Sequence, residues 1–167
     1  MNLFETDRLS IRAMSACDVE GLQHILTDRE AMKYSACGTF KSNDIRDFVA
    51  AEIETFTNSS FGYWPMISKS NGEVVGICGF NRHQIEQQNF VHINYRLATS
   101  YLKQGYATEV VLGLMKYARE TLRLTTLYAV ITPDNIKSIR VVERCNFKLF
   151  KRATFKDMQV NIYQVVT

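Results

Sequence analysis

Residues 104–109 read Gln104-Gly105-Tyr106-Ala107-Thr108-Glu109, and this stretch decides how the fold is predicted. It lies between an alternating apolar segment, residues 91–97, and an apolar run with helical spacing, residues 110–118. A strand, a tight turn with a glycine and the start of a helix leave several backbone amides without acceptors in the chain. Those amides and the positive end of the helix dipole favour an anion such as phosphate or pyrophosphate. The stretch therefore predicts an anion-binding turn.

The patterns on both sides of this turn predict a mixed α+β fold. Strands are expected at residues 9–12, 61–68, 73–80, 90–97, 127–131, 147–150 and 160–166, and helices are expected to begin near Ser15, Ser42, Tyr106 and Asn135. The segment Ser70-Asn71-Gly72 is a strong signal for a two-residue hairpin turn, whereas residues 81–89 are expected to be a polar connection. Antiparallel hairpins followed by a strand–helix–strand crossover predict a mixed, mostly antiparallel central sheet flanked by about four helices.

Length and composition are typical of one soluble domain that spans residues 1–167. A chain of 167 residues is long enough to bury a full core, and only two prolines leave little room for linkers. The formal net charge is +3, and the basic residues are scattered rather than gathered in a stripe. This distribution favours a small anionic ligand and indicates no nucleic-acid partner. No apolar run approaches membrane-spanning length and no apolar signal segment opens the chain, so a cytoplasmic protein without membrane contact is expected.

The cysteines predict neither disulfides nor a metal site. Cys17, Cys37, Cys78 and Cys145 form no Cys-x-x-Cys pair, and no histidine lies at metal-ligand spacing beside them. Cys78 and Cys145 fall in apolar surroundings, so buried free thiols in a reducing compartment are the simpler interpretation.

Several motifs make the sequence resemble the GNAT superfamily of acetyltransferases. The resemblance is strongest to the branch that contains ribosomal-protein N-terminal alanine acetyltransferases, and it spans nearly the whole chain in the family's order. The stretches that carry it are Thr6-Asp7-Arg8-Leu9-Ser10-Ile11-Arg12 near the N-terminus, Phe61-Gly62-Tyr63-Trp64 and Gly76-Ile77-Cys78-Gly79-Phe80 in the middle hairpin, Gly105-Tyr106-Ala107-Thr108-Glu109 in the turn, and Asn135-x-x-Ser138 with Glu143-Arg144-Cys145-Asn146-Phe147 in the last helix. The resemblance implies a GNAT-like fold.

By this resemblance the anion bound at the turn is the pyrophosphate of acetyl-CoA. The turn amides would hold the pyrophosphate, the strand end near Leu97 would pair with the pantetheine arm, and the Asn135 side chain would bind the same arm. The implied cofactor-binding residues are Leu97, Thr99, Gln104, Gly105, Tyr106, Ala107, Thr108 and Asn135. The alternatives are a plain helix entry at Gly105 and an ordinary N-cap at Asn135. Neither a P-loop motif nor a dinucleotide-binding Gly-x-Gly-x-x-Gly occurs in the sequence.

The family's proton-transfer residues differ in this chain. The family often has a glutamate where this chain has His92, whose unperturbed pKa of about 6.5 suits a proton acceptor. Many members have a tyrosine where this chain has Val142, and the hydroxyl of Ser138 is then the candidate for protonating the departing sulfur. His92 and Ser138 are therefore the predicted catalytic residues. The alternatives are a solvated or structurally bonded histidine and a small residue that allows tight helix packing.

The resemblance implies an N-acetyltransferase in which a primary amine attacks the thioester directly in a ternary complex. The amine belongs to a protein N-terminus or a small molecule. An α-amino group with a pKa of about 8 is neutral far more often than a lysine at about 10.4. The predicted acceptor pocket is lined by Tyr34, Trp64, Arg82, Asn94 and Arg96, and a monomer or homodimer is expected. A CoA-binding regulatory module without catalysis is the alternative, because the usual glutamate and tyrosine are both replaced.

Overall fold

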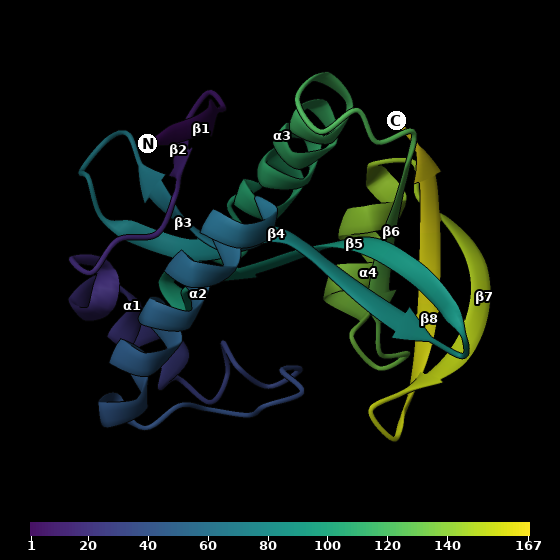
Figure 1. Ribbon diagram of the computed structural model, residues 1–167, viewed down its shortest axis with the longest axis horizontal. Coiled ribbons are helices and arrows are strands. Elements are labelled where there is room, and N and C mark those ends of the chain that lie inside the picture. Colours follow the sequence, from purple (N-terminus) through teal and green to yellow (C-terminus); the bar gives the residue numbers. More distant parts are fainter.

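An eight-stranded mixed sheet forms the centre of the computed structural model, which describes residues 1–167 (Figure 1). The strands lie in the order β1-β2-β3-β4-β5-β6-β8-β7. Their bounds are β1 Asn2–Glu5, β2 Leu9–Arg12, β3 Gly62–Ser68, β4 Val74–Ile85, β5 Gln88–Leu97, β6 Thr126–Ile131, β7 Lys148–Phe155 and β8 Met158–Val166. Every neighbouring pair is antiparallel except β5 and β6, which run parallel. The predicted mixed, mostly antiparallel sheet is therefore confirmed.

Four α-helices cover the two faces of this sheet. They are α1 Asp18–Leu26, α2 Ile45–Ser59, α3 Tyr106–Glu120 and α4 Ile136–Arg144, accompanied by short 3₁₀ turns at Ser42–Asp44 and Thr99–Tyr101. α1 and α2 pack through a cluster that includes Leu22, Val49 and Ile77. α3 and α4 pack through a larger cluster that includes Val110 and Cys78. Since Ile77 and Cys78 are neighbours on β4, the two clusters define opposite faces, the α1–α2 face and the α3–α4 face. None of these helices is long and apolar enough to span a membrane.

The hairpin formed by β4 and β5 is longer than the sequence pattern predicts. Residues 81–89, expected to be a polar connection, instead continue both strands to a two-residue turn at Glu86 and Gln87. Both turn residues have positive φ, 47° and 68°, which suits the twist of a tight hairpin. The hairpin curls over the C-terminal strands (Figure 1), where Phe90 packs against residues of β7 and β8 and Glu86 pairs with Lys151 at 3.3 Å. Polar residues occur here because only one side of the hairpin is buried.

The parallel strands β5 and β6 diverge soon after they meet. They pair only at His92 with Tyr128 and at Ile93 with Ala129. From Asn94 onward, β5 is bonded to β4 on one side and has no strand partner on the other. α3 follows the open end of β5 in the chain, and α4 follows the open end of β6. The divergence therefore leaves a free strand edge near the N-terminal ends of two helices.

Candidate active site

The turn between β5 and α3 presents free backbone amides. No amide from Lys103 to Thr108 donates a hydrogen bond within the chain, and the first helical amide to do so is that of Glu109, which donates to the Gly105 carbonyl at 3.1 Å. Lys103 and Gly105 have positive φ values, 61° and 84°. Such a left-handed turn before a helix gathers successive N–H groups into an anion-binding concavity. This geometry supports the prediction that Gln104, Gly105, Tyr106, Ala107 and Thr108 bind a pyrophosphate.

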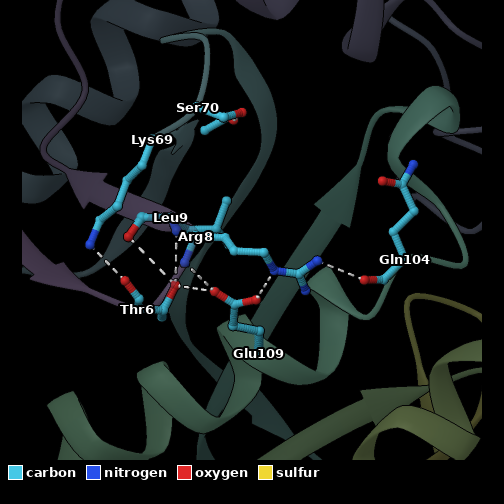
Figure 2. Close-up of polar contacts among 8 residues, drawn as sticks. Thr6, Arg8, Leu9, Lys69, Ser70, Gln104 and Glu109 are labelled. Carbon is cyan, nitrogen blue, oxygen red and sulfur yellow. Dashed lines mark hydrogen bonds and ion pairs between the residues drawn. The ribbon is translucent and has the colours of Figure 1, made fainter.

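Arg8 and Glu109 form an ion pair that holds this turn in place (Figure 2). The sequence pattern does not indicate this pair. The Arg8 Nε donates to Glu109 Oε2 at 2.6 Å, and its Nη1 donates to the Gln104 carbonyl at 2.9 Å. The Thr6 hydroxyl and the Arg8 amide donate to Glu109 Oε1 at 2.6 Å and 2.8 Å. Burial alone would raise the pKa of Glu109, but these bonds lower it overall. They tie the segment between β1 and β2 to the start of α3.

The Arg8 guanidinium also adds positive charge beside the free amides. It lies over the Tyr106 ring, 4.0 Å from the ring centroid. A Cβ atom placed on Gly105 would lie 3.4 Å from Arg8 Nη2, which has no hydrogen-bond partner in the chain. Both motifs that supply these residues were visible in the sequence, but nothing in either motif indicates that they meet.

The residues predicted to bind the pantetheine arm lie along the divergence of β5 and β6. Leu97 ends β5 and is buried, and Thr99 follows it with its hydroxyl donating to Asp28 at 2.9 Å. Asn135 is the N-cap of α4, because its Oδ1 accepts from the Ser138 amide at 3.3 Å. The side-chain oxygen of Asn135 is thus used by the helix, whereas its Nδ2 remains a donor for a ligand.

Tyr95 extends from β5 to the predicted catalytic Ser138 on α4. The Tyr95 hydroxyl lies 2.7 Å from Ser138 Oγ and donates to the Ser138 carbonyl at 3.2 Å. Burial raises the pKa of Tyr95, so the phenol stays protonated at physiological pH. The sequence pattern places Tyr95 only on the apolar side of its strand and gives no sign of this contact. Two hydroxyls therefore meet beside the open edge of β5.

The predicted base His92 is buried and paired with a second histidine. His92 Nε2 and His83 Nδ1 lie 2.8 Å apart on the α1–α2 face, and Phe155 packs against the His83 ring. Burial and the neighbouring His83 lower the pKa of His92 to about 4, and burial also lowers the pKa of His83. His92 is therefore a neutral but weak proton acceptor at physiological pH. This environment favours the alternative interpretation, a structurally bonded histidine.

We expect His92 to make the folded protein less stable as the pH falls from 6.5 to 4. Below its ordinary pKa of 6.5 the unfolded chain binds a proton at this residue, whereas the folded chain does so only near its pKa of about 4. The free energy of unfolding is therefore unaffected by His92 above pH 6.5 and falls by roughly 3 kcal/mol as the pH is lowered to about 4. Urea unfolding followed by circular dichroism at a series of pH values measures the loss.

The matched comparison for this experiment is His92→Gln, which keeps a neutral polar side chain. Its unfolding free energy should depend less steeply on pH over the same window, by about one bound proton. The lowered pKa of His83 acts in the same direction and persists in the variant, as does the nearby charge of Lys156. Identical slopes in the two proteins would contradict the lowered pKa of His92.

Other polar side chains of β4 and β5 line the α1–α2 face beside the histidines. Asn94 Nδ2 donates to Asn81 Oδ1, while Asn94 Oδ1 is buried without a hydrogen-bond partner. Arg96 lies two residues further along the same face, and burial lowers the pKa of its guanidinium. The structure thus brings together two of the predicted acceptor residues, Asn94 and Arg96.

Trp64, predicted to line the acceptor pocket, lies away from the other acceptor candidates, and its contact with an acceptor stays a prediction. Trp64 lies on the α3–α4 face, is fully buried and contacts Phe56, Phe80 and Tyr117. Strand alternation in β3 puts it on the side opposite Tyr63. An aromatic residue in a strand indicates burial but not the face, so the sequence pattern alone could not make this distinction.

The two remaining acceptor candidates lie at the margins of the site. Tyr34 belongs to the loop after α1, and its hydroxyl donates to the Asp134 carbonyl at 3.3 Å, so this loop reaches the start of α4 (Figure 1). Arg82 lies over the Phe61 ring, 5.2 Å from its centroid. It lines a cavity of about 440 Å³ between the end of α2 and strands β3 and β4, which Asn81 also lines. Their contact with an acceptor stays a prediction.

The chain thus has an α+β fold in which the parallel strands β5 and β6 diverge beside a turn with free amides. Residues 8–148 match the family model described as an acetyltransferase (GNAT) domain. The chain therefore belongs to the GNAT acetyltransferase family, and the predicted enzyme class, an N-acetyltransferase, is confirmed.

Similar proteins agree with this assignment. The N-acetyltransferase p20 of Bacillus licheniformis, itself uncharacterised, is 29% identical over 150 residues, which cover 89% of this chain and 83% of p20. A GNAT-family acetyltransferase from Bacillus anthracis has the same fold, with a TM-score of 0.82, 24% identity and coverage of 99% and 98% of the two chains. The ribosomal-protein α-N-acetyltransferase RimL, in complex with coenzyme A, has a TM-score of 0.81, 19% identity and coverage of 99% and 98%. The fold is thus shared with an enzyme of the ribosomal-protein branch.

Proposed function

We propose that the chain transfers the acetyl group of acetyl-CoA directly to a primary amine, that of a protein N-terminus or a small molecule, within a ternary complex. The observation that carries this proposal is the row of unbonded amides from residue 103 to residue 108 beside the free edge of β5. This arrangement suits a ligand with a diphosphate at one point and amide groups along an extended arm. Acetyl-CoA has both features.

The residues present in the chain fit acetyl-CoA. The turn amides and Arg8 would bind the pyrophosphate, while the free edge of β5 and the Asn135 Nδ2 would bind the pantetheine arm. When bound, acetyl-CoA supplies an activated acetyl group and a thiolate leaving group. Free N–H groups at the edge of β5 are donors that can stabilise developing negative charge on a carbonyl oxygen. The chain thus contributes positioning and hydrogen bonds rather than a covalent nucleophile.

The acceptor amine must be neutral when it attacks. Its nitrogen forms a bond to the acetyl carbon, the carbon–sulfur bond breaks, and one proton leaves the nitrogen while one is gained by the sulfur. An α-amino group with a pKa of about 8 is partly neutral at physiological pH, so a strong base is not required. A lysine side chain at about 10.4 would depend on one. The weak basicity of His92 therefore favours an α-amino group or another amine of modest pKa.

The Tyr95–Ser138 pair is the proposed proton donor to the sulfur. We expect Tyr95→Phe to lower kcat by less than about 100-fold, because a thiol with a pKa of about 8.5 is already a fair leaving group. The KM for acetyl-CoA should stay unchanged, since the phenol would act on the departing sulfur. The measurement is steady-state release of CoA with a saturating amine.

Ser138→Ala is the matched variant for this test, because the two hydroxyls lie 2.7 Å apart. If they form one relay, the double variant should be no slower than the slower single variant. A wild-type kcat in Tyr95→Phe across the accessible pH range would exclude the phenol as the proton donor.

A CoA-binding module without catalysis is the competing function, favoured by Val142 in place of a tyrosine and by the weak basicity of His92. Two measurements separate it from the enzyme. Calorimetry gives the affinity for CoA, and a thiol assay gives CoA release from acetyl-CoA with peptides, amino acids and polyamines as acceptors. Amine-dependent release supports the enzyme. Tight CoA binding without release in the presence of any amine would support the module.

A further inference from the structure

Arg96 carries a charge that no residue of the chain balances. Its side chain lies partly buried on the α1–α2 face of β5 and takes part in no ion pair or hydrogen bond within the chain. The titratable groups that act on the pKa of the guanidinium are the Tyr63 phenol and the Cys37 thiol, and neither is a carboxylate. Glu52, the acid beside Tyr63, accepts a hydrogen bond from the Tyr63 amide at 2.7 Å instead. Since charges withdrawn from water are normally paired, the partly buried guanidinium is suited to bind an anion from outside the chain.

Asn94 provides the complementary hydrogen-bond acceptor on the same face. Its Oδ1 is buried and accepts no hydrogen bond, because its Nδ2 is the group that contacts Asn81. Tyr63 and Asn94 both pair with Gly79, which lies between them in the sheet and has no side chain. A Cβ atom at Gly79, where φ is +154°, would clash with the Gly62 carbonyl. Tyr63 and Asn94 thus flank a position on the sheet that carries no side chain.

We propose that the acceptor carries a carboxylate close to its amine, so that Arg96 and Tyr63 bind the carboxylate and Asn94 Oδ1 accepts an N–H from the amine. This inference rests on the proposed N-acetyltransferase function and names its substrate class. The chemistry can come from a free α-amino acid or from an acidic first residue, Asp or Glu, of a peptide. The inference does not depend on His92 or on the proton donor.

The spacing along β5 suits such an acceptor. Residues two apart on one side of a strand are separated by roughly 6.6 Å, a span that the long Arg96 side chain can shorten. Asn81, which accepts a hydrogen bond from Asn94 Nδ2, also lines the cavity of about 440 Å³ at the end of α2, so this cavity lies beside Asn94, although Tyr63, Asn94 and Arg96 do not line it. A polyamine, which carries only positive charge, would leave Arg96 unpaired and bring like charges together.

Matched acceptors test the carboxylate directly. L-phenylalanine is compared with phenethylamine, and a peptide amide that begins with Asp is compared with the same peptide beginning with Asn. In the wild-type enzyme, one of these two pairs should show a kcat/KM about 100-fold higher for the acceptor that has the carboxylate. The acceptor that lacks the carboxylate leaves the Arg96 charge unpaired. The pair that shows the preference identifies the source of the carboxylate. Equal kcat/KM values within both pairs would overturn the proposal.

Variants assign this preference to Arg96. Arg96→Ala should remove it, Arg96→Lys should keep part of it, and Arg119→Ala, which removes an exposed guanidinium on α3, should leave it intact. A preference that survives Arg96→Ala would contradict the assignment. Thermal unfolding supplies a second readout: Arg96→Ala should melt no lower than the wild type, because the guanidinium has no partner in the free protein. A large loss of stability would instead indicate a structural role.

A binding measurement separates this inference from the proposed function. N-acetyl-L-phenylalanine and N-acetylphenethylamine are titrated into the protein–CoA complex by calorimetry, which requires no turnover. Tighter binding of the carboxylate that is lost in Arg96→Ala supports the inference even if no amine is acetylated. Equal binding of the two compounds, together with normal acetylation of neutral amines, would overturn the inference and leave the proposed function standing.

Discussion

Gly105→Val is expected to weaken acetyl-CoA binding by roughly 10- to 100-fold. Gly105 adopts a φ of +84°, a left-handed conformation that a β-branched residue reaches only at a cost of about 1–3 kcal/mol. The turn relieves this strain by rotating, and the rotation separates the amides that would hold the pyrophosphate. The valine side chain would also press on Arg8 Nη2, which lies 3.4 Å from the Cβ position. Isothermal titration calorimetry with CoA measures the change.

Gly105→Asn is the matched control, because asparagine tolerates the left-handed conformation better than any residue except glycine. It should bind CoA far more tightly than Gly105→Val and close to the wild-type affinity. Desulfo-CoA and a fragment that lacks the pyrophosphate sharpen the comparison, since only ligands with the diphosphate should respond to the substitution. Wild-type affinity in a folded Gly105→Val variant would exclude the turn as the pyrophosphate site.

Trp64→Ala is expected to lower the free energy of unfolding by about 3–5 kcal/mol. Trp64 is fully buried and contacts three aromatic rings, those of Phe56, Phe80 and Tyr117, so its removal leaves a large cavity. The measurement is urea unfolding followed by far-ultraviolet circular dichroism. Tryptophan fluorescence cannot serve, because Trp64 is the single tryptophan of the chain.

Trp64→Phe distinguishes packing from an acceptor contact. It keeps an aromatic ring and removes the indole N–H, which is buried without a hydrogen-bond partner, so the loss should be less than about 1.5 kcal/mol. The KM for the amine should equal that of the wild type, because Trp64 lies on the face opposite Asn94 and Arg96. A changed amine KM in Trp64→Phe would restore the original assignment of Trp64 to the acceptor pocket.

The secondary structure was largely predictable wherever local spacing carries the information. The helix that begins at Tyr106 follows from apolar periodicity. Turn chemistry also places a hairpin at Ser70-Asn71-Gly72, but the turn is longer than the two residues predicted, because the Ser68 amide donates to the Glu73 carbonyl at 2.9 Å to close it. The residues from Asn81 to Asn89 were not predictable in the same way, because a strand that is buried on one side only and capped by Glu86 and Gln87 resembles a polar loop. Their pairing depends on the C-terminal strands that the hairpin covers.

The donor side of the site was more predictable than the acceptor side. The amides of the turn are consecutive in the chain, so one short motif indicates the anion site. The Arg8–Glu109 pair joins residues 101 positions apart, and the sequence contains no sign that they touch. His92 was predicted as a base because it occupies the position of the family's usual glutamate and has a suitable unperturbed pKa. The actual pKa depends on burial and on His83, which only folding brings close to it.

The sequence by itself determined the family and the order of strands and helices from β2 onward, although it missed β1, and it predicted an anion-binding turn between β5 and α3, because these depend on local periodicity and on consecutive residues. Only the tertiary structure decided which side chains share a face and which charges lack a partner. In the folded protein Trp64 lies in the core and burial lowers the pKa of His92. Tyr95 contacts Ser138, and Arg96 has no charged partner beside Asn94. The physical reason is that burial and pairing depend on segments distant in the chain, which meet only when the sheet and its helices pack.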